Sequence, residues 1–121
     1  MIDRLGGVLL ISQNAPKLRD FYRDILGLNL STETHEGVPE HYECDLGNAH
    51  LAIHPAAGWP GVARDDAQSP VVLLETQNVQ ALVERLRAAG YAVPDAVDHG
   101  FAFVVAFRDP DGNLLEVLQP K

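Results

Sequence analysis

The stretch "FRDPDGNLLEVLQP", Phe107 to Pro120, joins a tight turn to an apolar strand. Pro110 sets the backbone φ of the second turn position and Gly112 accepts the positive φ that follows, so "DPDG" predicts a turn. The residues after it are rich in Leu and Val and predict a strand. Glu116 lies within this run, although a strand interior normally excludes a charge. The stretch therefore predicts a hairpin connection and a strand that carries one unexplained carboxylate.

Two helices are predicted at equivalent places in the two halves of the chain. Asn14 and Asn78 are suited to cap a helix N-terminus, and apolar residues at helical spacing follow each of them. Gly27 and Gly90 then supply the C-terminal stops. The caps lie 64 positions apart and the stop glycines 63. This spacing indicates an internal repeat.

Each predicted helix follows one strand-like run and precedes three others. Turn residues separate the runs. In order, they are GGVLLIS, LNLSTET, EHYECDL and AHLAIH in the first half, and PVVLLET, YAVPDAV, FAFVVAF and LLEVLQ in the second. The order βαβββ thus occurs twice, which predicts an α+β fold of two modules packed side by side.

One domain is expected, because 121 residues with 46% hydrophobic content suffice for one core. Within residues 1–121 we place module one at about 1–55, a linker at about 56–69 and module two at about 70–121. A linker of this length inside a compact domain is more often functional than incidental. Trp59 in this linker either stacks on a ligand at the mouth of a binding site or plugs a gap between the modules.

The acidic composition limits the partners. Nine basic and 17 acidic side chains give a net charge of −8, which repels nucleic acids and anionic membranes and leaves neutral or cationic small molecules. No signal peptide is visible and no apolar run approaches the roughly 18 residues of a membrane span, so a cytoplasmic location is expected. Cys44 is the single cysteine, and its neighbours Glu43 and Asp45 would raise its thiol pKa, so it is expected to be inert.

Two further stretches carry a resemblance to a known family. Together with the tandem βαβββ order, "FYRDILGL" after the first strand and "DPDGNLLEV" near the end resemble the vicinal oxygen chelate superfamily. That superfamily includes glyoxalase I, bleomycin-resistance proteins, fosfomycin-resistance enzymes and extradiol dioxygenases. The resemblance covers nearly the whole chain. It implies a cup-shaped curved mixed sheet with helices on the outer face, built within one chain or across a homodimer, and we expect a homodimer.

The resemblance also bears on a metal. Metal-using members hold the ion with four side chains, whose positions fall here at Gly7, Ala52, Val71 (Pro70 if the register slips by one) and Glu116. Only Glu116 can donate an electron pair to Zn²⁺, Ni²⁺, Mn²⁺ or Fe²⁺. We therefore expect no resident metal. Glu116 either holds a ligand or hydrogen-bonds backbone or water at the cup floor.

Histidines leave an alternative metal centre open. His50 and His54 alternate with Ala52 on one strand and are expected to face the cup. At about 3.3 Å per residue their Cβ atoms lie roughly 13 Å apart, whereas ligands of one metal bring their donor atoms to about 3–4 Å. They cannot chelate one ion together. His54 with Glu116 and a third group such as Glu75 is the remaining possibility.

The leading hypothesis is a metal-free glyoxalase/bleomycin-resistance-like protein that binds a small, mostly apolar or cationic organic molecule. Drug-sequestering members, which act in antibiotic resistance, work in this way. The expected ligand-binding residues are Leu9, Ile11, His50, His54, Trp59, Leu73, Glu75, Phe103, Glu116 and Leu118. The alternative is a metal-dependent lyase, isomerase or dioxygenase of the same superfamily that uses Glu116 and His54. A non-catalytic partner module is a third possibility.

Overall fold

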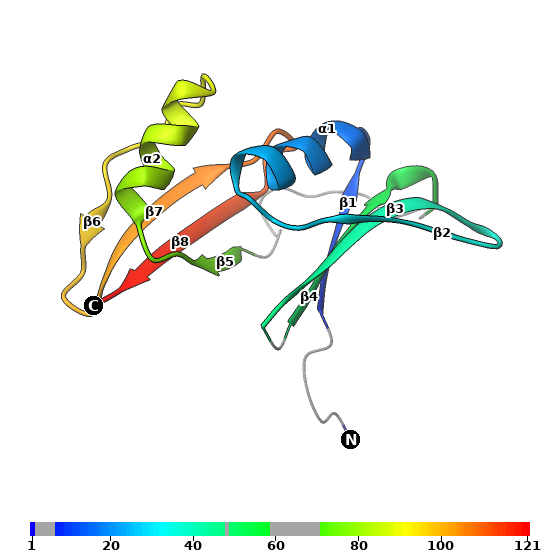
Figure 1. The fold of residues 1–121 in the computed structure, drawn as a ribbon, viewed down its shortest axis with the longest axis horizontal. Helices are drawn as coiled ribbons and strands as arrows, with labels where there is room; N and C mark the ends of the chain where they lie inside the picture. The colour runs from blue at the N-terminus through cyan, green and yellow to red at the C-terminus, as the bar shows by residue number, and fades with distance from the viewer. Residues whose placement is uncertain (2–6, 48, 59–70) are drawn as a thin grey trace. The chain divides into compact units, whose positions relative to one another are not determined.

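A computed structural model describes residues 1, 7–47, 49–58 and 71–121 of the chain (Figure 1). The chain forms two compact units, Met1–Ala63 and Arg64–Lys121. The first contains β1 Gly7–Ser12, α1 Ala15–Asp20, the π-helix η1 Phe21–Ile25, β2 Ser31–His35, β3 Val38–Leu46, β4 Ala49–Pro55 and the short 3₁₀ helix η2 Ala56–Gly58. The second contains β5 Val72–Glu75, α2 Val79–Ala88, β6 Val97–Asp98, β7 Ala102–Arg108 and β8 Leu114–Pro120.

Both units contain a four-stranded mixed sheet with the same topology. The strand order is β1-β4-β3-β2 in the first and β5-β8-β7-β6 in the second. The first strand of each unit runs parallel to its last strand, and the remaining pairs are antiparallel. The predicted α+β fold of tandem βαβββ modules is confirmed.

The helices begin and end where the caps predict. Asn14 Oδ1 accepts from the Lys17 amide at 3.3 Å, and Asn78 Oδ1 accepts from the Ala81 amide at 3.0 Å. Gly27 and Gly90 have positive φ angles of 77° and 91°. A residue in this conformation commonly ends a helix, and glycine adopts it at low cost because it has no Cβ.

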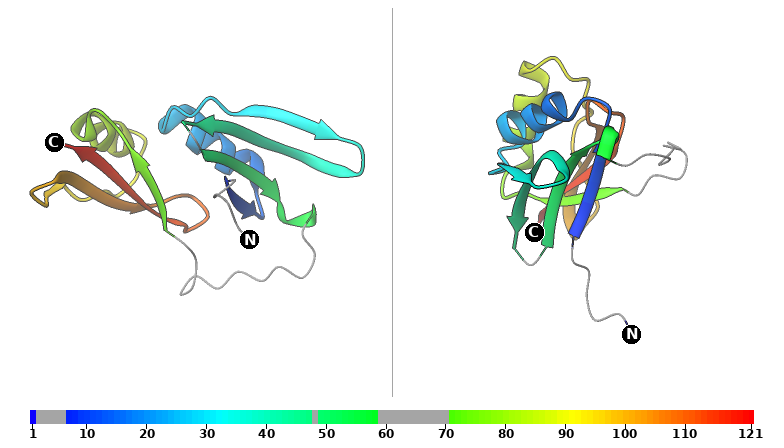
Figure 2. Two further views of the ribbon diagram at one scale, coloured as in Figure 1. Left: turned by 90° about the horizontal axis from the view of Figure 1, so that it is seen from below. Right: turned by 90° about the vertical axis from the view of Figure 1, so that its right-hand side faces the viewer.

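Each helix packs on one face of its own sheet (Figure 2). Because side chains alternate along a strand, this face holds every second residue and forms the core. The core strand residues of the first unit include Leu10, Tyr42, Leu51 and Ile53, and those of the second include Val72, Val105, Phe107, Leu115 and Val117. The opposite strand face of each unit is not covered by that unit's helix.

Two predicted strands differ from the structure. Of the run "YAVPDAV", only Val97 lies in a strand, β6 Val97–Asp98. Pro94 has no amide hydrogen, and the Val93 carbonyl accepts from the Arg87 guanidinium at 2.8 Å, so neither takes part in a ladder. The run "LNLSTET" becomes a strand only from Ser31 onward. Its first amide, that of Leu28, instead donates to the Tyr22 carbonyl at 2.9 Å and closes the helix end.

Candidate functional site

The uncovered strand face of the second unit is mainly apolar with two carboxylates. We call it the open face of module two. Leu73 lies opposite Glu116, which in turn lies opposite Ala106 on β7, and Glu75 lies opposite Leu118. Residues paired across strands share a face, so these five side chains lie on one surface. On this face Leu73 is 59% exposed and Glu116 is half-buried. The strand pairing confirms the prediction that Leu73, Glu75, Glu116 and Leu118 share one face.

The first unit has a corresponding open face, the open face of module one. There Gly7 lies opposite His50, Leu9 opposite Ala52 and Ile11 opposite His54. Leu9 is 45% exposed. The predicted grouping of Leu9, Ile11, His50 and His54 on one face is therefore confirmed within this module.

Phe103 was placed on the wrong face by the sequence. It lies opposite Gln119, one residue out of step with Leu118 and Glu116, and so shares the helix-covered face with Val105 and Val117. The Lys121 ammonium lies 4.9 Å from the centre of its ring. Phe103 therefore does not share a face with the other expected ligand-binding residues of this unit. Trp59 and Pro70 lie outside the described residues.

A cluster of histidines and acids occupies the open face of module one, and the sequence predicted only part of it. His41 lies between two other imidazoles, because its ring stacks on that of His54 at 4.2 Å and 12° and lies 5.2 Å from that of His35. His41 is only 4% exposed. Its Nδ1 lies 3.1 Å from the Pro39 carbonyl, which can only accept, so Nδ1 carries a proton. The three rings come from β2, β3 and β4.

Glu43 lies between His41 and a fourth imidazole, that of His50. Its Oε2 lies 3.2 Å from His50 Nε2 and 3.6 Å from His41 Nε2, and Asp45 Oδ1 lies 3.0 Å from His50 Nδ1. The hydrogen bond to Asp45, followed by that to Glu43, raises the pKa of His50. Burial and then the neighbouring His41 lower the pKa of His54. His50 therefore holds a proton more tightly than a free histidine, whereas His54 holds one less tightly.

The signal for this cluster was present in "EHYECDL". His41, Glu43 and Asp45 alternate there with the apolar side chains Tyr42 and Cys44, so they occupy one face of β3. Which histidine each of them meets depends on the pairing with β4, which alternation within one strand does not specify.

The four family positions do not fit a metal. Among the described positions, the side chains of Ala52 and Val71 have no atom that can donate an electron pair to a metal. Gly7 has no side chain, and there is no space for one, since a Cβ there would meet the His50 carbonyl oxygen at 2.4 Å. Across residues 7–47, 49–58 and 71–121, no group of three or more His, Cys, Asp or Glu side chains is arranged to hold a metal ion. Glu116 is the one donor among these described positions.

Cys44 is buried on the helix side of β3, at 8% exposure. Burial, with a contribution from Asp45, raises its thiol pKa. The expected inert role of this cysteine is in keeping with its position, because a nucleophile must be both ionised and accessible.

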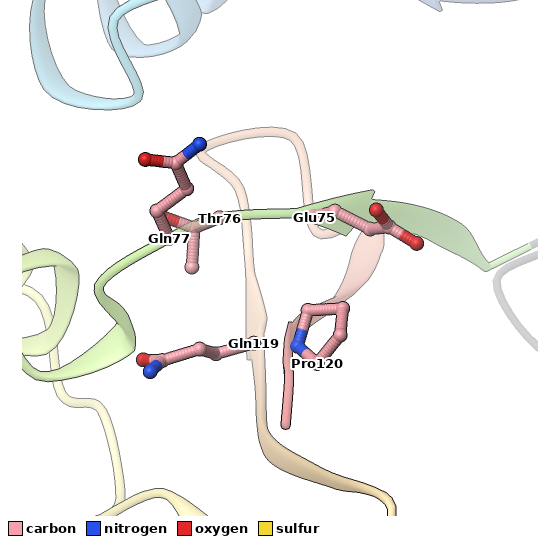
Figure 3. A pocket seen from close by; sticks show the side chains of 5 residues that line it. All are labelled: Glu75, Thr76, Gln77, Gln119 and Pro120. Atoms are coloured by element: carbon pink, nitrogen blue, oxygen red, sulfur yellow. The ribbon is translucent and has the colours of Figure 1, made fainter.

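A polar hollow lies where β5 and β8 end (Figure 3). Its volume is about 570 Å³, and its lining residues are Glu75, Thr76, Gln77, Gln119 and Pro120. Glu75 belongs both to this hollow and to the open face of module two.

The sequence model of the Glyoxalase/Bleomycin resistance protein/Dioxygenase superfamily matches residues 4–117. The chain belongs to this superfamily. Among the curated proteins, none matches the chain. Within the described part of this superfamily member, no helix is long and apolar enough to cross a membrane.

Solved structures share the superfamily fold along nearly the whole chain. TnmS3, an antibiotic binding protein from Streptomyces sp. CB03234, is 24% identical with a TM-score of 0.79, over 99% of this chain and 98% of that one. A glyoxalase/bleomycin resistance protein from the same Streptomyces strain is 23% identical with a TM-score of 0.76, over 96% and 100%. A glyoxylase/bleomycin resistance protein/dioxygenase domain from Frankia sp. EAN1pec is 18% identical with a TM-score of 0.75, over 100% of both chains. At these identities the similarity establishes the fold.

Proposed function

We propose that this protein binds a small, mostly apolar or cationic organic molecule without a metal, as a resistance or sequestration protein. The observation that carries the proposal is the open strand face of each module. Leu9 and Leu73, 45% and 59% exposed, lie there beside a few polar groups, such as His50 on one face and Glu116 on the other. An apolar wall with few polar groups is typical of small-molecule sites.

Affinity in this proposal comes from apolar contact and from charge. Each exposed leucine that a ligand covers contributes about 25 cal/mol per Å² of apolar surface removed from water. The net charge of −8 favours a cation over an anion. The described antibiotic-binding relative, TnmS3, supports the proposal through its shared fold over 99% of the chain.

Three further statements belong to the same proposal. The protein forms a homodimer and acts in the cytoplasm. Ligand binding needs no metal, because Glu116 is the one donor among the described family positions. Light scattering coupled to size exclusion measures the mass of the particle and tests the homodimer.

Binding is tested by thermal shift and calorimetry with planar cationic antibiotics. Leu9→Gln and Leu73→Gln should weaken binding, whereas Leu46→Gln should not, because Leu46 lies opposite Ala49 and outside the open faces. A wild-type protein that binds none of these compounds would contradict the proposal. A metal-dependent enzyme of the superfamily would instead hold close to one equivalent of Zn, Ni, Mn or Fe and lose it in Glu116→Gln.

A further inference from the structure

The hollow at the ends of β5 and β8 lies at the edge of the open face of module two. Glu75 connects the two, since it lines the hollow and lies opposite Leu118 on that face. We infer that this hollow binds the ammonium group of an amine whose apolar body lies on Leu73 and Leu118. The inference rests on the proposed function and names the chemical class of its ligand.

The hollow has a fixed backbone frame. The Thr76 amide donates to the Leu118 carbonyl at 2.8 Å, and the Asn78 amide donates to Thr76 Oγ1 at 3.3 Å. The Val79 amide at the start of α2 donates to Gln119 Oε1 at 2.8 Å. These bonds tie the end of β5 to β8 and to the helix, so the site is formed before a ligand arrives, which lowers the entropic cost of binding.

Several acids of the second unit have a cationic partner, whereas none is found for the Glu75 carboxylate among the described residues. Asp95 bonds to Arg87 at 2.9 Å, and Asp98 bonds to Lys121 at 2.7 Å. Within the described part of the chain, the side chains of Glu75 and Gln77 make no hydrogen bond or ion pair. A carboxylate without a cation at the edge of a hollow is suited to bind one from solution.

The lining chemistry selects an amine and disfavours an anion. An ammonium group has three donors and no acceptor, and it forms its strongest bonds with a carboxylate. Figure 3 shows the Glu75 carboxylate at one side of the hollow and the amides of Gln77 and Gln119 at the other. The amides suit a second polar group of the ligand. The start of α2 offers little to an anion, because Gln119 and Asn78 already accept from the amides of Val79 and Ala81.

The charge of the ligand is tested with two fluorescent probes that share an aromatic body. Dansylcadaverine carries a primary ammonium group, and dansylamide carries none. We expect the wild-type protein to bind dansylcadaverine about tenfold more tightly than dansylamide, as one charge-assisted bond provides. This preference should fall with added salt, because salt screens a partly exposed ion pair.

The role of Glu75 is tested with a matched pair of variants. Glu75→Gln should abolish the tenfold preference, because it removes the negative charge that the ammonium group contacts. Glu84→Gln makes the same change in net charge on an exposed face of α2, outside the hollow, and should preserve the preference. Both side chains are exposed, so both variants should fold, and circular dichroism checks this.

The outcomes separate the inference from the proposed function. If both probes bind equally, or if Glu75→Gln and Glu84→Gln behave alike, the ammonium site is wrong and the ligand-binding function stands. If neither probe nor any planar antibiotic binds the folded wild-type protein, both are wrong.

Discussion

Glu116 lies opposite Leu73 in the parallel pairing of β5 and β8. The same register in the first module places Ala52 opposite Leu9. Equivalent positions of the two modules thus hold a carboxylate and a methyl group. This asymmetry places one acid, Glu116, beside the apolar Leu73 and Ala106 on the open face of module two, and it underlies both the proposed loss of the metal and the proposed apolar ligand.

The two faces of the second sheet should respond differently to the same substitution. Leu115→Ala should lower the free energy of unfolding by about 2–5 kcal/mol, because Leu115 is fully buried under α2 and its removal leaves a cavity. Leu73→Ala should change it by at most about 0.5 kcal/mol, since Leu73 is 59% exposed. Urea denaturation measures both, and equal losses would contradict the assignment of the faces.

His50 should stabilise the protein more at acidic pH. Its pKa is raised by Asp45 and Glu43, so the folded state holds the proton more tightly than the unfolded chain. The stabilisation is complete below the ordinary pKa of 6.5 and is lost as pH rises through the folded pKa. Because the ring is 35% exposed, it should amount to only about 0.2–1 kcal/mol. Denaturation of wild type and His50→Gln between pH 5 and 9 measures it, and a pH-independent difference would refute it.

His54 should have the opposite dependence. Burial and then His41 lower its pKa, so the unfolded chain binds the proton more tightly than the folded state. Stability is therefore retained above pH 6.5 and falls as pH drops below that value. His54→Gln should be less sensitive to acid than wild type in the same denaturation series. The quantity to compare is the slope of the free energy of unfolding against pH. Loss of the stacked His54 ring lowers that free energy equally at every pH and so leaves the slope unchanged. A steeper acid dependence in the variant would argue against this account.

Cys44 should react slowly in the folded protein. Its thiol is buried, and burial and Asp45 raise its pKa, so little thiolate is present or accessible. A thiol-specific chromogenic disulfide at pH 8 should label the native protein far more slowly than the denatured one. The denatured chain is the internal control, because Cys44 is its single cysteine. Equal rates would contradict the position of Cys44.

Removal of metal should leave the protein unchanged. Since Gly7, Ala52 and Val71 provide no donor atoms, prolonged treatment with EDTA should not shift Tm or weaken binding of a cationic antibiotic. Metal analysis of protein purified without chelators should find well below one equivalent of Zn, Ni, Mn or Fe. Glu116→Gln serves as the control, and a metal content that disappears in this variant would establish a metal centre.

Local patterns were sufficient for most of the fold. Asn14 and Asn78 marked the two helix starts, and Gly27 and Gly90 their ends, because capping and positive φ depend on single residues and their near neighbours. Alternation within each strand predicted which side chains share a face. It was correct for Leu73 and Glu75 on β5 and for Glu116 and Leu118 on β8.

Relations between strands were harder to predict. Phe103 was assigned to the face of Glu116, but β7 pairs with β8 so that Phe103 lies opposite Gln119. A change of register by one residue moves every side chain of a strand to the other face, so an error of one reverses the assignment. The same uncertainty concealed the meeting of Glu43 with His41 and His50.

The sequence by itself determined the repeated βαβββ order, the helix limits and the absence of donor side chains at Gly7, Ala52 and Val71, since each depends on residue identity and short-range geometry. Tertiary structure alone decided the imidazole cluster around His41 and the polar hollow beside Glu75. These depend on which residues of different strands become neighbours, and strand pairing sets that through hydrogen bonds between segments distant in the chain.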